Sequence, residues 1–382
     1  MGGLSRPARP SVMRVAVISH TYVVQANRGK LEALARSPGL RMLLVVPRTW
    51  QNSDIRQRLR AEAPQEGPLA VAPLSAWSLG SGSLITYAPV ALWRLLARFK
   101  PDLIHLEEEP WSLAALELSL VCRALGVPLT FFTWENTDRP SLLPFRLIRR
   151  SVLRHAGAAV AGNAAAKTLL QQRGFGKTVT VLPQLGVDTA AFCPGARGAG
   201  PHETVVGYVG RLVTQKGILV LLEAVTRLSA EVRVMVVGSG PLRVQLLRDA
   251  KALGLDGRLD LHEAVPHREI PRYLRSMSVL VLPSLATPTW KEQFGHVLVE
   301  AMACGVPVVA SDSGAIPEVM GDAGLLVREG DAAGLAAALQ RVLTDAALRQ
   351  NLAERGRARV LAHYTNEVVA QRLAAIWREV LS

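Results

Sequence analysis

The feature that most constrains this chain is a regular alternation of short apolar runs, rich in β-branched residues, with longer helical stretches. Strands that are apolar throughout and separated by helices form a parallel sheet covered on both faces. The expected strands are residues 14–19, 41–46, 69–72, 102–106, 129–133, 158–162 and 179–183 in the first half, and 204–210, 232–238, 259–265, 279–284, 307–311 and 324–327 in the second. The pattern predicts an α/β protein.

The alternation is interrupted once, in the Gly- and Pro-rich segment CPGARGAGPHE. Because 382 residues exceed one ordinary domain, we expect two doubly wound, Rossmann-like domains, 12–192 and 204–365, joined by a linker at 193–203. The amphipathic segment 366–382 should form a helix that packs back on the N-terminal domain, and residues 1–11 should be a disordered tail. Ligands bind beyond the carboxyl ends of the strands in such sheets, so two facing sheets should enclose a cleft.

Composition excludes several classes of protein. No run approaches the roughly 18 apolar residues of a membrane-spanning helix. Residues 12–19 are too short an apolar run for a signal peptide, and Arg14 interrupts them. Cys122, Cys193 and Cys304 are odd in number and far apart, which favours a reducing cytoplasm and argues against disulfides or a zinc site.

The net charge of +13 is unevenly distributed: residues 1–200 hold 24 Lys and Arg against 12 Asp and Glu, and the second half is nearly neutral. The halves should therefore face different partners. Residues 141–156 combine arginines with leucines in a basic amphipathic pattern suited to an anionic membrane surface. A helix packed on the sheet with solvated arginines explains the pattern equally well. The charge favours a lipid-linked or otherwise anionic partner, whereas the lack of a nucleic-acid motif argues against nucleic acid.

In the second half, GYVGRLVTQKG runs from a strand through Gly210 and Arg211 to Lys216 and then into a helix. The two cations could hold a phosphate at the strand end together with helix N–H groups. Two solvated surface cations would give the same pattern. The loop around Val265 could hydrogen-bond a nucleobase edge through its backbone.

The segment WKEQFGHVLVEAMACGVPVVAS carries two glutamates, Glu292 and Glu300, eight positions apart. Eight helical residues span about 12 Å and end roughly 80° past two full turns, so both carboxylates can face one cleft from opposite ends of a long ligand. Phe294 and Gly295 should start the helix and Gly305 should end it. The free N–H groups at the start of this helix would then lie between the carboxylates, at Gly295, His296 and Val297.

These motifs, from about residue 204 to 332, resemble in order and spacing the donor-binding domain of family-4 retaining glycosyltransferases, the glycosyl transferases group 1, which have the GT-B fold. The resemblance implies that Arg211 and Lys216 hold the donor diphosphate and that Glu300 binds the ribose. Glu292 would contact the sugar hydroxyls, helped by backbone N–H groups from Phe294 to Val297.

No acidic cluster in the sequence marks a metal site, so we expect a metal-independent enzyme without a cofactor. The resemblance further implies a hexosyltransferase-like enzyme, and the basic first half favours a lipid-linked or otherwise anionic acceptor. It would transfer a sugar from a nucleotide-diphosphate sugar during synthesis of a cell-envelope polysaccharide, glycolipid or related glycoconjugate. We expect it in the cytoplasm, at the inner face of the membrane if the basic segment binds lipid. A sugar-nucleotide epimerase and a non-catalytic sugar-nucleotide-binding protein remain as alternatives.

The acceptor half departs from the family pattern. Many relatives carry a histidine near the reacting sugar carbon, but no histidine occurs between His105 and His155 here. Its role should pass to Glu135 or Asn136 in TWENTD, which follows an expected strand. Other strand-end candidates are His20, Thr21, Trp111, Trp134 and the glutamates at 107–109, although a solvated loop would also explain His20 and these glutamates.

Overall fold

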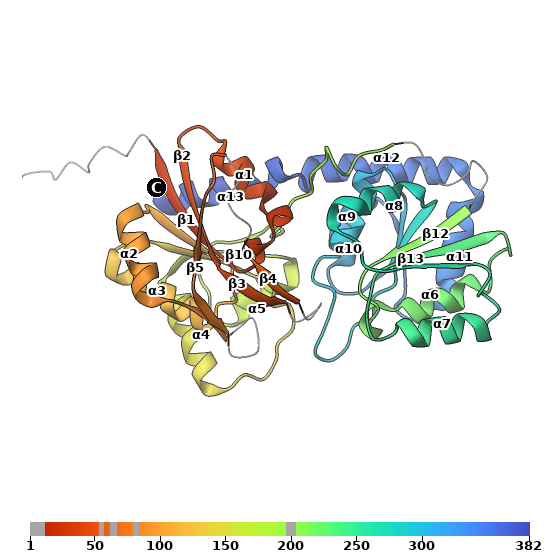
Figure 1. Ribbon diagram of the computed structural model, residues 1–382, viewed down its shortest axis with the longest axis horizontal. Coiled ribbons are helices and arrows are strands. Elements are labelled where there is room, and N and C mark those ends of the chain that lie inside the picture. Colours follow the sequence, from red (N-terminus) through yellow and green to blue (C-terminus); the bar gives the residue numbers. More distant parts are fainter. Residues whose placement is uncertain (1–11, 53–56, 62–66, 79–83, 196–203) are drawn as a thin grey trace, which may run out of the picture.

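The computed structural model describes residues 12–52, 57–61, 67–78, 84–195 and 204–382. The expected tail and most of the expected linker lie outside these residues. Figure 1 shows two α/β domains side by side. Every expected strand is present in one of the two parallel sheets, which confirms the predicted fold class.

The first domain is built on a seven-stranded parallel sheet of order β11-β10-β9-β8-β1-β2-β5. Its strands are β1 (Met13–Ile18), β2 (Leu40–Pro47), β5 (Ala70–Leu74), β8 (Leu103–Leu106), β9 (Leu129–Thr133), β10 (Ala156–Ala161) and β11 (Val179–Val181). Its helices are α1 (Gly29–Ala35), α2 (Pro89–Phe99), α3 (Leu113–Leu125), α4 (Leu143–His155) and α5 (Ala164–Gln172).

Strand β1 shows why the sheet is covered on both faces. Ala16 and Ile18 enter the core beside α2, α3 and α4, whereas Val15 and Val17 enter the core beside α1. All four are fully buried. Successive side chains of a strand point to opposite faces, so an uninterrupted apolar strand needs a layer of helices on each side.

Two antiparallel hairpins were not anticipated from the sequence: β3 (Thr49–Asn52) with β4 (Gln57–Arg60), and β6 (Ala76–Ser78) with β7 (Ile85–Tyr87). These strands are short and partly polar, so neither an apolar run nor a clear alternation announces them.

The second domain has a six-stranded parallel sheet of order β14-β13-β12-β15-β16-β17. Its strands are β12 (Thr204–Val209), β13 (Val232–Val237), β14 (Leu259–His262), β15 (Val279–Leu282), β16 (Val308–Ser311) and β17 (Leu325–Val327). Its helices are α6 (Ile218–Val225), α7 (Arg243–Ala252), α8 (Ile270–Ser276), α9 (His296–Ala303), α10 (Ile316–Met320), α11 (Ala332–Thr344) and α12 (Ala346–His363).

In both sheets the chain reverses its direction of progress beside the first strand. β1 lies between β2 and β8, and β12 lies between β13 and β15. Adjacent loops leave such a switch point on opposite faces of the sheet, which opens a crevice beyond the carboxyl ends of the strands. Each domain therefore has a natural ligand position, beyond β1 and β8 in one and beyond β12 and β15 in the other.

The last helix, α13 (Asn366–Leu381), connects the domains. Thr365 caps its start, because the hydroxyl accepts a hydrogen bond from Val368 N at 3.1 Å. Leu373 and Trp377 are buried in the core of the first domain, in the same cluster as Leu31 of α1. Figure 1 shows α12 and α13 running along one side of the molecule from the second domain back to the first.

Among the residues that the structure describes, no helix combines the length and apolarity needed to cross a bilayer.

Candidate active site

The loop after β12 brings Lys216 to the switch point of the second domain. A 3₁₀ turn, Thr214–Lys216, is followed by Gly217 in the left-handed region, with φ at 64°. A Cβ atom on Gly217 would lie 1.8 Å from the carbonyl oxygen of Pro283 after β15, so only glycine allows this approach. Earlier in the loop, Tyr208 OH donates to the carbonyl of Arg211 at 2.7 Å, which fixes the backbone beside Gly210.

Glu292 lies where the loops after β12 and β15 meet. Its Oε2 is 2.6 Å from Lys216 Nζ and accepts a hydrogen bond from Ser284 Oγ at 2.8 Å. The residue is only 5% exposed, and the Lys216 ammonium also lies 5.3 Å from the centre of the Trp290 ring. The carboxylate is therefore held in place by an ammonium and a hydroxyl, and it can exchange these two partners for the polar groups of a ligand.

Helix α9 begins at His296, later than the sequence suggested. Gly295 has φ at 78°, which an α-helical residue cannot adopt, and its carbonyl accepts the first bond of the helix from Leu298 N at 2.8 Å. The N–H groups of His296 and Val297 therefore belong to the first turn, where no helical acceptor exists. Phe294 is buried, and its ring packs 5.6 Å from that of Tyr364.

About one turn into α9, Glu300 faces a different element. Its Oε1 lies 2.8 Å from Nε2 of His267, in the loop after β14 that also contains Val265. The hydrogen bond to Glu300 raises the pKa of His267. The pKa of His296 is lowered instead, because burial disfavours its charged form. The two glutamates thus contact separate loops, but Glu292 precedes α9 and only Glu300 lies on it, so the expected span of eight helical residues between the two carboxylates is wrong.

In the first domain, Glu107 and Glu108 follow β8 at the other switch point. Glu107 is buried, accepts from Tyr22 OH at 2.5 Å and lies 2.6 Å from Lys30 Nζ. Burial would raise the pKa of Glu107, but Lys30 and His105 outweigh it and lower the pKa to about 2. Glu108 places both carboxylate oxygens 2.7 Å from Nδ1 of His20.

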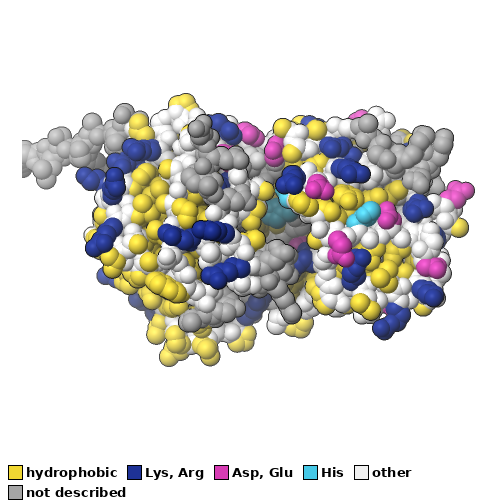
Figure 2. Space-filling view, viewed as in Figure 1, with side chains coloured by type: hydrophobic (Ala, Val, Ile, Leu, Met, Phe, Trp, Pro, Cys, Tyr) yellow, Lys and Arg dark blue, Asp and Glu magenta, His cyan; other side chains and the backbone are white. Residues whose placement is uncertain are grey.

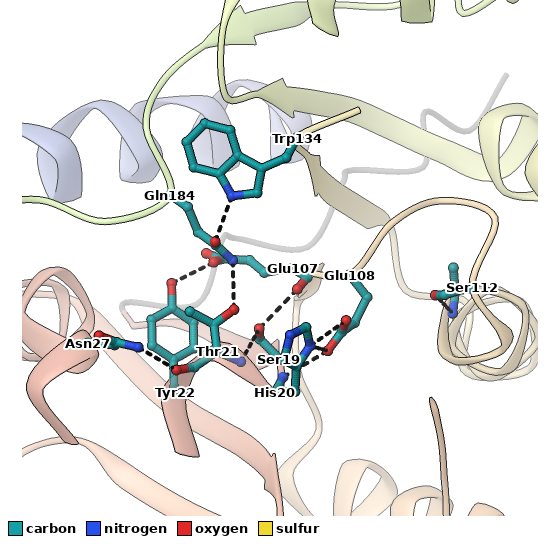
Figure 3. Close-up of polar contacts among 11 residues, drawn as sticks. Ser19, His20, Thr21, Tyr22, Asn27, Glu107, Glu108, Ser112, Trp134 and Gln184 are labelled. Atoms are coloured by element: carbon teal, nitrogen blue, oxygen red, sulfur yellow. Dashed lines mark hydrogen bonds and ion pairs between the residues drawn. The ribbon is translucent and has the colours of Figure 1, made fainter. Parts of the chain in front are cut away.

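Glu109 links β8 to the start of the TWENTD segment. Its carboxylate accepts from Thr133 Oγ1 at 2.5 Å and from Trp134 N at 2.9 Å, and burial raises its pKa to about 7. Trp134 Nε1 donates to Gln184 at 2.9 Å, and Gln184 Nε2 donates to Thr21 Oγ1 at 3.1 Å. Figure 3 shows this chain of contacts beside His20 and Glu108.

These residues enclose a cavity of about 240 Å³ at the carboxyl ends of β1, β8 and β9. Its lining is His20, Thr21, Glu107, Glu108, Glu109, Phe132, Trp134 and Gln184.

The two domains meet at the loop that carries Glu292. Asn136 Nδ2 donates to the Glu292 carbonyl at 3.3 Å, Gln293 Nε2 donates to the Trp134 carbonyl at 3.2 Å, and Asn163 Nδ2 donates to the Gln293 carbonyl at 2.8 Å. Figure 2 shows the molecule hollowed between the domains. The segment after β9 therefore touches the loop of Glu292 directly.

The two residues proposed to replace the family's histidine have different surroundings. The Glu135 carboxylate binds Arg173, with N–O distances of 2.5 and 3.1 Å, and so is held by an arginine of its own domain. Asn136 reaches the backbone of Glu292 instead. Of the pair, Asn136 is the one whose side chain contacts the loop of Glu292.

Three residues at this junction were not predicted from the sequence as site residues: Asn163, Gln184 and Gln293. Asn163 and Gln184 follow strands β10 and β11, so their strand-end positions were a usable signal. Among the described residues, no group of three or more His, Cys, Asp or Glu side chains is placed to hold a metal ion.

Comparison with known proteins agrees with this architecture. Residues 196–359 match the family model described as glycosyl transferases group 1, and residues 23–184 match a glycosyl transferase 4-like domain. Phosphatidyl-myo-inositol mannosyltransferase of Mycolicibacterium smegmatis is 32% identical over 306 residues, which cover 77% of this chain and 75% of that protein. The 2-deoxystreptamine glucosyltransferase of Streptomyces kanamyceticus is 30% identical, covering 66% and 71%.

Among solved structures, Anabaena HepE in complex with UDP superposes with a TM-score of 0.73 at 18% identity, over 96% of this chain and all of that one. This likeness supports the fold. Together with the sequence matches on both halves, it shows that the chain belongs to the glycosyl transferases group 1 family and is a glycosyltransferase of the GT-B type.

Proposed function

We propose that the protein is a retaining glycosyltransferase that moves a hexose from a nucleoside-diphosphate sugar to an acceptor held by the first domain. The observation that carries the proposal is the Lys216–Glu292 pair, 2.6 Å apart at the switch point of the second domain and followed directly by the N-terminus of α9. The cation suits the diphosphate of such a donor, the carboxylate suits the hydroxyls of its sugar, and the unsatisfied N–H groups suit the phosphate oxygens that lie between them.

In this arrangement Lys216 and Arg211 bind the diphosphate, with the N–H groups of His296 and Val297. Glu292 binds hydroxyls of the transferred sugar, and Glu300 binds the ribose, while the backbone around Val265 borders the base. The neighbour HepE was solved with UDP, which supports a nucleotide at this position. Asn136 contacts the Glu292 backbone across the cleft, so it is the better candidate for the place of the missing histidine.

We propose further that the reaction needs no metal. When the bond between the sugar and the diphosphate breaks, negative charge develops on the departing oxygens. Lys216, Arg211 and the first turn of α9 are fixed where that charge appears, and such preorganised donors stabilise a transition state without a metal ion. After transfer, Lys216 and Arg211 can bind the diphosphate of the free nucleotide product in the same way.

The acceptor is proposed to belong to a cell-envelope polysaccharide, a glycolipid or a related glycoconjugate. Supporting this, α4 presents Leu142, Leu143 and Leu147 to solvent at 71%, 64% and 56% exposure, beside Arg146 and Arg150. Exposed leucines among arginines suit the surface of an anionic bilayer. The enzyme would then work in the cytoplasm, against the inner face of the membrane.

The test is a panel of nucleoside diphosphates and their sugars. A donor that binds the folded protein and is present at 100 times its Kd should raise the free energy of unfolding by about 2.7 kcal/mol, and with it the Tm. With the donor identified, proton NMR of the product should show the donor's anomeric configuration, and EDTA should leave the rate unchanged.

Each alternative predicts a different outcome of this panel. An epimerase would convert the nucleotide sugar without any acceptor, and a sensor would bind it without transfer or hydrolysis. An inverted product would contradict retention, and loss of activity in EDTA with recovery in magnesium would contradict the metal-free leaving-group stabilisation.

A further inference from the structure

We propose that the cavity at the carboxyl ends of β1, β8 and β9 holds the reacting ring of the acceptor and selects an uncharged or cationic polyhydroxy ring over one that carries a phosphate or carboxylate. The inference rests on the proposed function and names its substrate class.

The charges around the cavity are the first argument. Its lining contains three glutamates and no lysine or arginine among the described residues. Glu107 is compensated from behind by buried Lys30, and Glu108 by His20, whose pKa is raised by Glu108 despite burial. Among the described residues, Glu109 contacts Thr133 and Trp134 and no cation. The lining therefore offers an incoming anion no lysine or arginine, and the imidazole of His20 is already paired with Glu108.

An anion placed here would lie close to Glu108 and to Glu109, and the Glu109 carboxyl, whose pKa is raised to about 7, becomes fully charged as the pH rises above 7. Unit charges about 4 Å apart repel by roughly 4 kcal/mol near a protein surface. Hydroxyl and ammonium groups, in contrast, donate to carboxylate oxygens in strong, charge-assisted hydrogen bonds. The same electrostatics that exclude a phosphate therefore favour a polyol or an amino sugar.

The second argument is the combination of polar and aromatic walls. Phe132 and Trp134 pack edge to face, with ring centres 5.0 Å apart, and Gln184 holds the indole N–H at 2.9 Å. Thr21 and His20 add a hydroxyl and a ring nitrogen on the opposite side (Figure 3). A sugar or cyclitol ring has apolar C–H faces and polar edges, and it matches a pocket with a few placed polar groups on aromatic walls.

Size and position agree with a reacting ring. At about 240 Å³ the cavity has room for one six-membered ring. Trp134 forms part of its wall and also touches the donor side, because its carbonyl accepts from Gln293 and its ring lies 6.2 Å from that of His296. A ring in the cavity thus adjoins the loop that carries Glu292.

The excess positive charge of the first half and the cavity proposed for the reacting ring lie in different places. The excess positive charge of the first half had suggested an anionic acceptor, but an arginine cluster of that half lines a separate cavity on α4, at Arg146, Arg149, Arg150 and Arg154. An acceptor can carry an anionic or lipid part there while its reacting ring is neutral.

The experiment uses ligand-observed NMR on the full chain saturated with the nucleoside diphosphate that the panel identifies. The probes are glucose, glucosamine and myo-inositol, each compared with its monophosphate. At least one neutral or cationic probe should bind, and about tenfold or more tighter than its phosphate, which corresponds to roughly 1.4 kcal/mol.

Variants then locate the preference in the cavity. Glu109→Gln and Glu108→Gln should each weaken binding of the favoured probe several-fold. They should also reduce the ratio between its affinity and that of its monophosphate, with the Kd of the nucleoside diphosphate unchanged. The matched control is Glu117→Gln, because Glu117 is another carboxylate of the first domain, bonded to Thr86 and Tyr87 outside the cavity. It should leave both probe affinities as in the parent.

Phosphorylated probes that bind as tightly as their parents would overturn the inference, as would a preference unaffected by either cavity variant. Failure of every probe to bind would overturn it as well. In all three cases, nucleotide binding and sugar transfer by the unmodified protein would leave the proposed function in place, whereas a chain that binds no nucleoside diphosphate would refute that function first.

Discussion

At the scale of single residues, the proposed donor site depends on a cation and a carboxylate held together before any ligand arrives. Lys216 and Glu292 lie on loops 76 positions apart, and Gly217 is the residue that allows these loops to meet. Because the pair is already ordered, a donor would find both groups in place and little rotamer entropy would be lost on binding.

Lys216→Ala should lower kcat by about 10²–10³, the usual cost of losing one preorganised donor at developing charge. Its hydrogen bond should strengthen as the diphosphate departs, so the loss should appear in kcat and in kcat/KM alike. Lys216→Arg should recover little, since a planar fork does not replace a point charge. Steady-state kinetics measure both variants, and a change confined to KM would place Lys216 in ground-state binding alone.

Glu107 makes a different prediction, because it is buried with Lys30 behind the cavity. Glu107→Gln leaves that ammonium without its partner and should cost about 3–5 kcal/mol of unfolding free energy at pH 7. The folded pKa of about 2 lies below the usual 4.5, so the carboxylate stabilises the fold above pH 4.5 and loses this effect as the pH falls toward 2.

Urea unfolding of parent and variant between pH 7 and pH 3 checks this, and the gap should shrink as the pH falls. The double variant Lys30→Met with Glu107→Gln should regain part of the loss at pH 7. An equal gap at every pH would show that packing, and not the ion pair, sets the cost.

At the scale of elements, the strands and the start of helix α9 show how much of the structure could be predicted from the sequence. The strands were predictable because uninterrupted runs such as LTFFT have few alternatives to a buried strand. The start of α9 was placed too early, because the letters FGH do not reveal that Gly295 adopts a left-handed conformation. The surroundings of Glu135 and Asn136 were out of reach too, since Arg173 and Glu292 are distant in sequence and only the folded chain brings them near.

Helix α4 confirms one of the two explanations of its pattern, that of a packed helix, while the membrane explanation stays a prediction. Ile148 and Val152 are buried against the sheet, as expected of a packed helix, while Leu142 and Leu147 remain exposed beside the arginines. The sequence alone could not separate these faces, because both contain leucine-like residues. The exposed face is the part available to a membrane.

The protein should therefore bind anionic vesicles more than neutral ones, and less as the salt concentration rises. Arg146→Glu with Arg150→Glu should lower partitioning by about tenfold or more, because each basic residue near the surface contributes about 1 kcal/mol. The control is Arg227→Glu with Arg248→Glu, two exposed arginines of the second domain. Sedimentation with vesicles measures partitioning, and equal losses in both variants would leave α4 without a specific role.

At the scale of the whole molecule, each of the two sheets reverses its strand order once, and the two resulting crevices lie on either side of the contact between the domains, called the seam below. Trp134 and Asn136 reach the seam from the first domain, and the loop of Glu292 and Gln293 reaches it from the second. Helix α13 ties the last helices of the second domain to the first-domain core. The charge distribution predicted different partners for the two halves, and this stays a prediction, whereas the hydrogen bonds across the domain junction could not be predicted from the sequence.

The most direct test of the account is calorimetry of the identified nucleoside diphosphate with the parent, Glu300→Ala and Glu292→Ala. Glu300→Ala should weaken binding by about 10- to 100-fold, because hydrogen bonds to a charged group contribute roughly 1.5–3 kcal/mol. Glu292→Ala should bind the nucleotide as tightly as the parent, or tighter because Lys216 is released, and yet lose most of its transfer activity. If both variants bound the nucleotide like the parent, or if Glu292→Ala were the one that lost it, the two carboxylates would not divide ribose and sugar between them and the central claim would be wrong.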